Sequence, residues 1–192
     1  MKTDIILCGV GGQGILSIAT VLGEAATASG LHLKQAEVHG MSQRGGDVQS
    51  HLRLSTERIW SDLIPRGKAD LILSMEPMEA LRYLPWLSAD GRVVSASKPL
   101  VNIPDYPDAA ALSAELSSLP RVSVLDIDAL ALEHRIPRAA NMILLGMTAP
   151  FLGILKPEAL REAVARVFAP KGEAVVEADL KAFDLGLAAG CQ

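Results

Sequence analysis

Apolar and polar positions repeat with two different periods along the chain, which predicts strands interleaved with helices. Short apolar runs between turn residues predict buried strands at residues 4–8, 31–37, 71–75, 92–96 and 122–126. Stretches with a period near 3.6 predict helices at residues 14–29, 77–84, 128–134, 141–147, 157–168 and 174–189. This alternation indicates an α/β fold: a Rossmann-like, mainly parallel sheet flanked by helices.

One segment departs from that simple order. Residues 48–54 alternate between apolar and polar side chains, residues 55–57 have the composition of a turn, and residues 58–61 follow as a second short strand. Residues 48–61 therefore predict a β-hairpin within the otherwise parallel sheet. Because no repeat or low-complexity linker divides the chain, we expect residues 1–192 to form a single domain.

Composition narrows the class of protein. Hydrophobic residues make up 49% of the chain and charged residues 21%, with a net charge of −4, which indicates a globular protein. A weakly acidic chain is not expected to bind nucleic acid or to anchor to a membrane through basic residues. Residues 5–23 are uncharged over a length that can cross a bilayer. Glycines and Gln13 interrupt them, so strand–loop–helix is the better interpretation.

The cysteines argue against metal clusters. Cys8 and Cys191 are too few for a disulfide framework or for a four-cysteine iron–sulfur cluster. Neither an H-E-x-x-H nor a C-x-x-C motif occurs, so no metal site is predicted. Without a recognisable signal peptide, we expect the chain to be cytoplasmic.

A glycine-rich loop is the first candidate site. Residues 9–14 match G-x-G-x-x-G between a predicted strand and a predicted helix, and the candidates are Gly9, Gly11, Gly12, Gln13 and Gly14. Glycines permit positive φ and close backbone approach, and the helix N-terminus offers free N–H groups to an anion. The same glycines equally suit a tight strand-to-helix turn that binds nothing.

A polar segment over residues 37–47 is the second candidate site. Glu37 ends the second predicted strand, about where a dinucleotide fold places its ribose-binding acid. Arg44 can clamp a carboxylate or a phosphate through its planar fork. If the first two predicted strands are neighbours, this segment faces the glycine loop.

Ordinary structural roles remain open for the side chains of this segment. His39 can simply bond a backbone carbonyl, and Arg44 can pair with Asp47 or with a partner subunit. Ser42 and Gln43 belong to the same candidate set, but no G-x-S-x-G motif makes Ser42 a nucleophile.

These two motifs resemble a known family. The sequences G-V-G-G-Q-G at 9–14 and Q-A-E-V-H-G-M-S-Q-R-G-G at 35–46 resemble the gamma-type subunit of 2-oxoacid:ferredoxin oxidoreductases, most closely of the indolepyruvate type. The resemblance extends to residues 61–65, 69–71, 74–85, 101–104, 141–142 and 150–152. It therefore covers nearly the whole chain.

The resemblance implies a subunit of a larger enzyme. Such an enzyme decarboxylates a 2-oxoacid with thiamine diphosphate and Mg²⁺, passes electrons through iron–sulfur clusters to ferredoxin, and transfers the acyl group to coenzyme A. In the indolepyruvate type, the catalytic alpha-type partner subunit carries the thiamine site and the clusters. The present chain has no thiamine signature and no cluster cysteines, which agrees with an accessory role without activity of its own. Alternatives are a stand-alone NAD-dependent dehydrogenase and a purely structural assembly subunit.

The surfaces of this subunit carry further expectations. Three occupants suit the two candidate loops: the partner's backbone, the thiamine diphosphate region held by the partner, or part of coenzyme A. Of these, a partner surface bordering the active site is favoured. Met78, Tyr83 and Trp86 are expected to form an interface that is at least partly exposed in the isolated chain, which can then associate as a homodimer.

Overall fold

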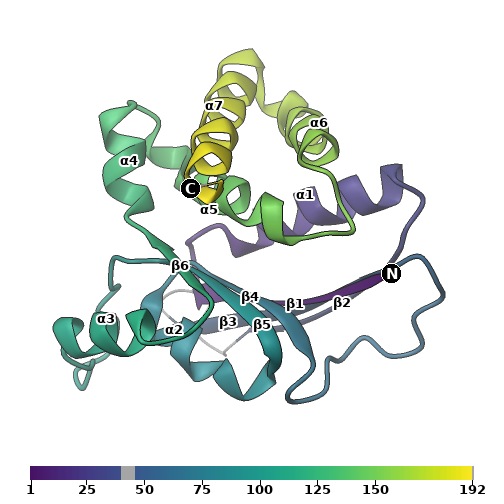
Figure 1. Cartoon of the computed structure of the whole chain (residues 1–192). Helices are drawn as coiled ribbons and strands as arrows, with labels where there is room; N and C mark the ends of the chain where they lie inside the picture. Colours follow the sequence, from purple (N-terminus) through teal and green to yellow (C-terminus); the bar gives the residue numbers. More distant parts are fainter. Residues whose placement is uncertain (40–45, 192) are drawn as a thin grey trace.

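A six-stranded sheet with helices on both faces forms the molecule (Figure 1). This computed structural model describes residues 1–39 and 46–191, apart from the side chain of His39. The strands are β1 (Lys2–Val10), β2 (His32–His39), β3 (Asp47–Ser55), β4 (Ala69–Ser74), β5 (Leu87–Ala96) and β6 (Val122–Leu125). The helices are α1 (Ile15–Ala28), α2 (Pro77–Arg82), α3 (Ala109–Ser117), α4 (Ile127–Glu133), α5 (Ala140–Thr148), α6 (Pro157–Phe168) and α7 (Glu173–Gly190). Short 3₁₀ turns include η2 (Pro137–Ala139) and η4 (Ala169–Lys171).

The strand order is β2-β3-β1-β4-β5-β6. β1, β4, β5 and β6 pair in parallel, whereas β3 is antiparallel to both β1 and β2. The α/β class with a mainly parallel sheet is therefore confirmed. Strand–loop–helix at residues 5–23 is also confirmed, and no helix in the described part of the chain is long and apolar enough to cross a bilayer.

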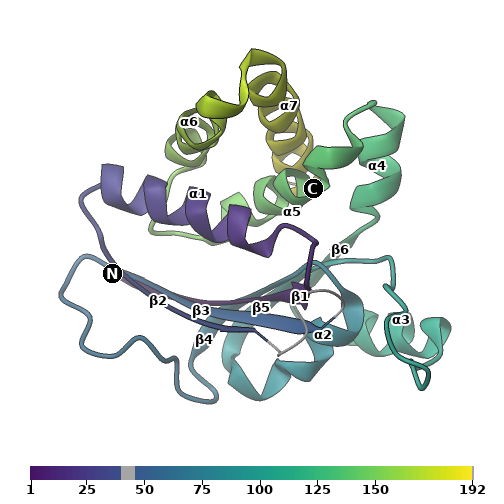
Figure 2. The same cartoon turned by 180° about the vertical axis from the view of Figure 1, so that it is seen from behind.

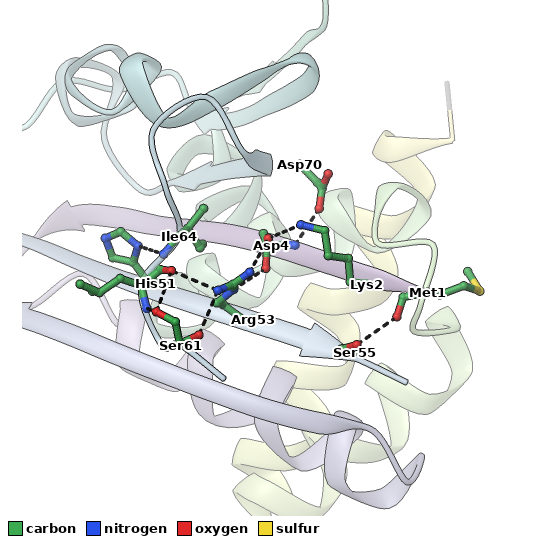
Figure 3. Close-up of polar contacts among 10 residues, drawn as sticks. Met1, Lys2, Asp4, His51, Arg53, Ser55, Ser61, Ile64 and Asp70 are labelled. Atoms are coloured by element: carbon green, nitrogen blue, oxygen red, sulfur yellow. Dashed lines mark hydrogen bonds and ion pairs between the residues drawn. The ribbon is translucent and has the colours of Figure 1, made fainter. Parts of the chain in front are cut away.

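The predicted hairpin at 48–61 is wrong in its second half. Residues 58–61 form no strand; β3 instead makes its hairpin with the preceding β2. The segment after β3 is held by side chains of the sheet (Figure 3): Arg53 donates from Nη1 to the carbonyl oxygens of Ser61 and Leu63, and Ile64 N donates to His51 Nδ1. These bonds satisfy backbone groups that a returning strand would otherwise pair.

Alternating side chains of β1 enter two different cores. Ile5 and Leu7 pack against α1, α5 and α6, whereas Ile6 and Cys8 face α2 and α3. Figure 2 shows the same two layers from behind, with α1, α5, α6 and α7 above the sheet and α2 and α3 below it. Helix α3 was not predicted from the sequence, and its two buried residues, Leu112 and Leu116, give it only a narrow apolar stripe.

Glycines let α5 and α7 approach closely. A Cβ atom on Gly146 would lie 2.0 Å from Phe183 O, and one on Gly186 would lie 1.9 Å from Ile143 O. Backbone therefore meets backbone across this pair of helices, and both lie on the same face of the sheet as α1 (Figure 1).

Candidate functional site

The glycine loop joins β1 to α1 at the carboxyl edge of the sheet. Gly12 has φ +101° and Gly14 has φ +83°, conformations that favour glycine, and a Cβ atom on Gly12 would meet nothing within 4 Å. Gln13 Oε1 accepts a hydrogen bond from Val10 N at 2.7 Å, and Gln13 Nε2 donates to Met75 O at 3.1 Å. Gln13 therefore braces the loop against the end of β4, while Gly12 leaves a bare patch of backbone.

The described ends of the two candidate loops lie together. Gly11 N donates a hydrogen bond to Gly46 O at 2.9 Å, because β3 starts beside the end of β1 with Val10 opposite Asp47. Three candidates, Ser42, Gln43 and Arg44, lie outside the described residues.

Strand β3 separates the first two predicted strands, which are not neighbours. Glu37 lies opposite Ser50 of β3, and Ser50 lies opposite Leu7 of β1. At the usual strand spacing, Glu37 is two strands, or about 10 Å, away from β1. β2 also continues to His39 instead of ending at Glu37. A ribose-binding acid requires adjacency to the glycine loop, so Glu37 does not occupy that position.

A cleft of about 980 Å³ opens beside the glycine loop. Gly12, Gln13 and Gly14 line one side, and the segments that follow β4, β5 and β6 supply Met75, Lys98 and Ile127. The remaining walls come from α4 to α7 and their connections. Open α/β sheets bind ligands at this edge, next to the point where the strand order reverses, here between β1 and β4.

Cations surround this cleft. The four basic residues among its lining are Lys98, Arg135, Arg138 and Lys171. Its acidic lining residues are Asp128 and Asp179, and Asp128 is 3.6 Å from Lys98 Nζ. Together with the N-terminus of α1, this excess of positive charge favours an anionic ligand.

Arg135 takes up a backbone conformation that usually belongs to glycine. Its φ is +61°, and it is the only non-glycine residue with positive φ among those described. It follows α4 as a left-handed cap, with Ile136 N donating to Ala131 O at 2.8 Å. An arginine in this conformation costs about 1 kcal/mol or more.

Asn141 connects α5 to the glycine loop. Its Nδ2 donates to Gly14 O at 3.1 Å, and a Cβ atom on Gly14 would lie only 2.6 Å from that nitrogen. Gly14 is therefore needed both for its positive φ and for the close approach of Asn141. The resemblance had already included Asn141, but without a role for its side chain.

A buried carboxylate holds the segment beside the cleft. Glu76, fully buried after β4, accepts hydrogen bonds from Glu79 N at 2.9 Å, from Leu100 N at 3.3 Å and from the Tyr106 hydroxyl. Burial, together with the contact to Glu76, raises the pKa of Tyr106 above its usual value. Glu76 thus fixes residues 97–107, whose first part lines the cleft with Lys98 and Leu100.

The expected interface residues differ in exposure. Tyr83 is only 4% exposed and packs in the lower core, so it is not a surface residue of the isolated chain. It packs there because its ring tilts against Trp86, with centroids 5.6 Å apart, and because its hydroxyl reaches Asp47 Oδ2 at 3.5 Å. Trp86 and Met78 are partly exposed, as expected.

Most of the cleft has no signature in the sequence. Apart from the glycine loop, its charged lining residues are Lys98, Asp128, Arg135, Arg138, Lys171 and Asp179. These residues are spread over more than eighty positions, and none of them belongs to a local motif. The absence of a glycine after α4, where a helix cap favours one, was the available signal for Arg135.

Comparison with known proteins places this fold and sequence in one family. The model of the pyruvate ferredoxin/flavodoxin oxidoreductase family matches residues 4–189. Indolepyruvate oxidoreductase subunit IorB of Pyrococcus horikoshii is 35% identical over 195 residues, covering 97% of this chain and 95% of that protein.

Two solved structures share the fold. The gamma subunit of keto/oxoacid ferredoxin oxidoreductase from Geobacter sulfurreducens has a TM-score of 0.69 at 24% identity, with 98% of each chain covered. The 2-oxoglutarate:ferredoxin oxidoreductase of Magnetococcus marinus, solved with 2-oxoglutarate, coenzyme A and succinyl-CoA bound, has a TM-score of 0.77 at 21% identity; 99% of this chain aligns with 31% of that one. The chain therefore belongs to the pyruvate ferredoxin/flavodoxin oxidoreductase family.

Proposed function

We propose that this chain is the non-redox subunit of a 2-oxoacid:ferredoxin oxidoreductase that acts on indolepyruvate or a related arylpyruvate. In this proposal, the alpha-type partner subunit holds thiamine diphosphate, Mg²⁺ and the iron–sulfur clusters, and the complex reduces ferredoxin. The similarity to an indolepyruvate oxidoreductase subunit over almost the whole of both chains supports the substrate class. We expect the chain alone to have no turnover.

The cleft beside the glycine loop gives this subunit a role at the active site. Coenzyme A is a phosphorylated co-substrate, and the cleft combines a volume of about 980 Å³ with four cationic lining residues and the N-terminus of α1. The fold match to an enzyme solved with coenzyme A is consistent with that occupant. We therefore assign the cleft to coenzyme A, and the surface around it to the partner subunit that borders it.

Each part of the cleft has a distinct physical task in this proposal. The exposed backbone at Gly12 lets a phosphate approach the start of α1 without a side chain in the way. Arg135 and Arg138 supply guanidinium groups that pair with phosphate oxygens. Asn141 and Gln13 hold the loop in place, through Gly14 O and Met75 O.

The geometry disfavours a stand-alone NAD-dependent dehydrogenase. Such an enzyme needs an acid at the end of the strand adjacent to the glycine loop, and β3 keeps Glu37 away from that place. A purely structural subunit would need no cationic cleft beside the glycine loop.

Reconstitution tests the proposal. The chain is co-expressed with an alpha-type subunit from the same organism, and arylpyruvate-dependent reduction of a viologen dye is measured with and without coenzyme A. We expect the two chains to co-purify and to reduce the dye only when both chains and coenzyme A are present. NAD-dependent turnover by the chain alone, or full activity of the alpha-type subunit without this chain, would contradict the proposal.

A further inference from the structure

An exposed apolar segment lies at the edge of the cleft. Residues 97–107, which we call the strap, connect β5 to α3 without forming a helix or a strand. Leu100 lines the cleft and is itself exposed. Val101, the next residue, is 73% exposed, and Ile103 is exposed as well. Three apolar side chains within four residues therefore face solvent in the isolated chain, next to the candidate site.

The strap is held in place on both sides of its exposed part. Leu100 N at 3.3 Å and the Tyr106 hydroxyl both donate to Oε1 of the buried Glu76, so residues 101–105 lie between two bonds to one carboxylate oxygen. Three prolines also restrict the backbone of the strap, namely Pro99, Pro104 and Pro107. A segment that is ordered before it binds loses little conformational entropy on docking, which favours a contact surface.

A second exposed apolar group lies at the other edge of the sheet. Trp60 and Leu63 belong to the segment after β3, which runs antiparallel to β1 and ends opposite Lys2. Figures 1 and 2 show this segment and α3 at opposite ends of the sheet. Leu63 is 57% exposed, and Arg53 holds its backbone carbonyl. Exposure and order are therefore similar in the two groups, and only their position relative to the cleft distinguishes them.

The chemistry of the proposed function determines which of these groups faces the partner subunit. Coenzyme A in the cleft receives an acyl group that is formed on the alpha-type subunit, so the cleft has to open toward that subunit. The strap borders this opening through Leu100, whereas Leu63 lies at the far edge of the sheet. A second copy of the present chain supplies no acyl group, so the partner subunit is the occupant that fits the strap.

We propose that the strap docks on an apolar surface of the alpha-type partner subunit, with Val101 and Ile103 as its buried contacts. The inference rests on the proposed function and deepens it, because it names the segment through which the partner closes over the cleft. Docking removes these side chains from water, and the apolar contact excludes water from the edge of the cleft.

A charge placed on the strap tests the proposal. The dissociation constant of the complex between the full chain and the alpha-type subunit is measured by biolayer interferometry for the parent chain and for Val101→Asp. We expect Val101→Asp to raise the dissociation constant at least about tenfold, because a carboxylate would be buried against an apolar surface. Val101→Leu keeps the side chain apolar and should bind within about threefold of the parent.

Leu63→Asp is the matched control. It introduces the same charge at an exposed aliphatic side chain, in a segment that is also irregular and held by hydrogen bonds. We expect this variant to bind the alpha-type subunit within about threefold of the parent. Both aspartate variants should keep the urea midpoint of the parent chain, because neither side chain is buried in the isolated fold.

The outcomes separate this inference from the proposed function. If Val101→Asp binds as tightly as the parent, if Leu63→Asp weakens binding equally, or if Val101→Asp lowers the urea midpoint of the isolated chain, the docking role of the strap is overturned. The proposed function stands in each of these cases, because the parent complex still forms and turns over. If the parent chain does not bind the alpha-type subunit at all, both the docking role and the proposed function are overturned.

Discussion

The amide nitrogen of Gly11 donates a hydrogen bond to the carbonyl oxygen of Gly46 at 2.9 Å. This bond ties the glycine loop after β1 to the residue that precedes β3, on the carboxyl edge of the sheet. The same edge carries the cationic cleft, so the glycine loop borders the cleft on one side and the start of β3 on the other. A ligand in the cleft and a partner chain at the start of β3 would therefore both contact this loop.

Because α5 and α7 are in close contact, adding a single methyl group at Gly186 should strongly destabilise the fold. Gly186→Ala would place a Cβ atom 1.9 Å from Ile143 O, a backbone atom that cannot move without shifting the helix. We expect a loss of about 2–4 kcal/mol in the free energy of unfolding, measured by urea denaturation. Gly23→Ala is the control, because its nearest neighbour is the flexible Leu33 side chain at 3.3 Å and alanine favours helix. Equal stability of the two variants would contradict the close packing of α5 and α7.

The two cysteines should differ in reactivity. Cys8 is fully buried in β1, and burial raises the pKa of its thiol far above the usual value, whereas Cys191 is exposed. A thiol-specific dye such as Ellman's reagent should therefore label one cysteine in the native chain and two in denaturant. Rapid labelling of Cys191→Ser under native conditions would show that Cys8 is accessible. Because Cys8 is a core residue whose thiol makes only a weak hydrogen bond to Glu79 O, at 3.6 Å, Cys8→Ala should leave turnover of the assembled complex within a few fold of the parent.

The ion pair under the sheet predicts a dependence of stability on pH. Burial raises the pKa of Asp4, but bonds from Arg53 and Lys2 lower it by more, so that its pKa lies below 3.8 (Figure 3). This contribution to stability is fully present above the unfolded pKa and is lost as pH falls through the lower folded value. Asp4→Asn should therefore be less stable than the parent at pH 7, and the difference should shrink below about pH 4. The control is Asp90→Asn, which removes an exposed pair with Arg121 and should have little effect.

For Asp179 we expect the opposite dependence of stability on pH. Burial raises its pKa to about 6 in the folded chain, so between the unfolded value and pH 6 the native state keeps a proton that the unfolded state releases. The free energy of unfolding should fall as pH rises through that window, by about 2–3 kcal/mol, and Asp179→Asn should lack this fall. The measurement is urea denaturation of both chains without ligand from pH 4 to pH 7.5. Parallel curves would show that Asp179 is not buried as described.

Sequence patterns predicted those elements whose bounds are determined by residues within the element itself. The bounds of α6 follow from Pro157 at its first position and from its apolar stripe, and both lie within the helix itself. The sequence at 58–61 suits a strand as well, but Arg53 of β3 donates to Ser61 O at the end of this segment, and His51 of β3 accepts from Ile64 N just beyond it. Only the folded sheet brings those partners together, so no local pattern could show the difference.

The candidate site also has one part that local sequence patterns predict and one part that they do not. The glycine loop was recognisable because its glycines perform a local task, a turn with positive φ at Gly12 and Gly14. Asp179 on α7 and Arg135 in the turn after α4 come from far along the chain, and only the packing of the helices over the sheet brings them to the cleft beside that loop. Their residue types alone, an acid and a base, are typical of solvent-exposed positions.

The most direct test of the account is the KM for coenzyme A in the reconstituted complex that contains Gly12→Val. The valine side chain would occupy the bare patch beside the cleft, so we expect the KM to rise at least about tenfold while assembly is retained. The matched control is Gly30→Val, at the far end of α1: it also has positive φ, +69°, and nothing within 4 Å of its Cβ, so it carries comparable backbone strain away from the cleft. We expect a raised KM for Gly12→Val alone. An unchanged KM in an assembled Gly12→Val complex, or an equal rise in the Gly30→Val complex, would contradict it.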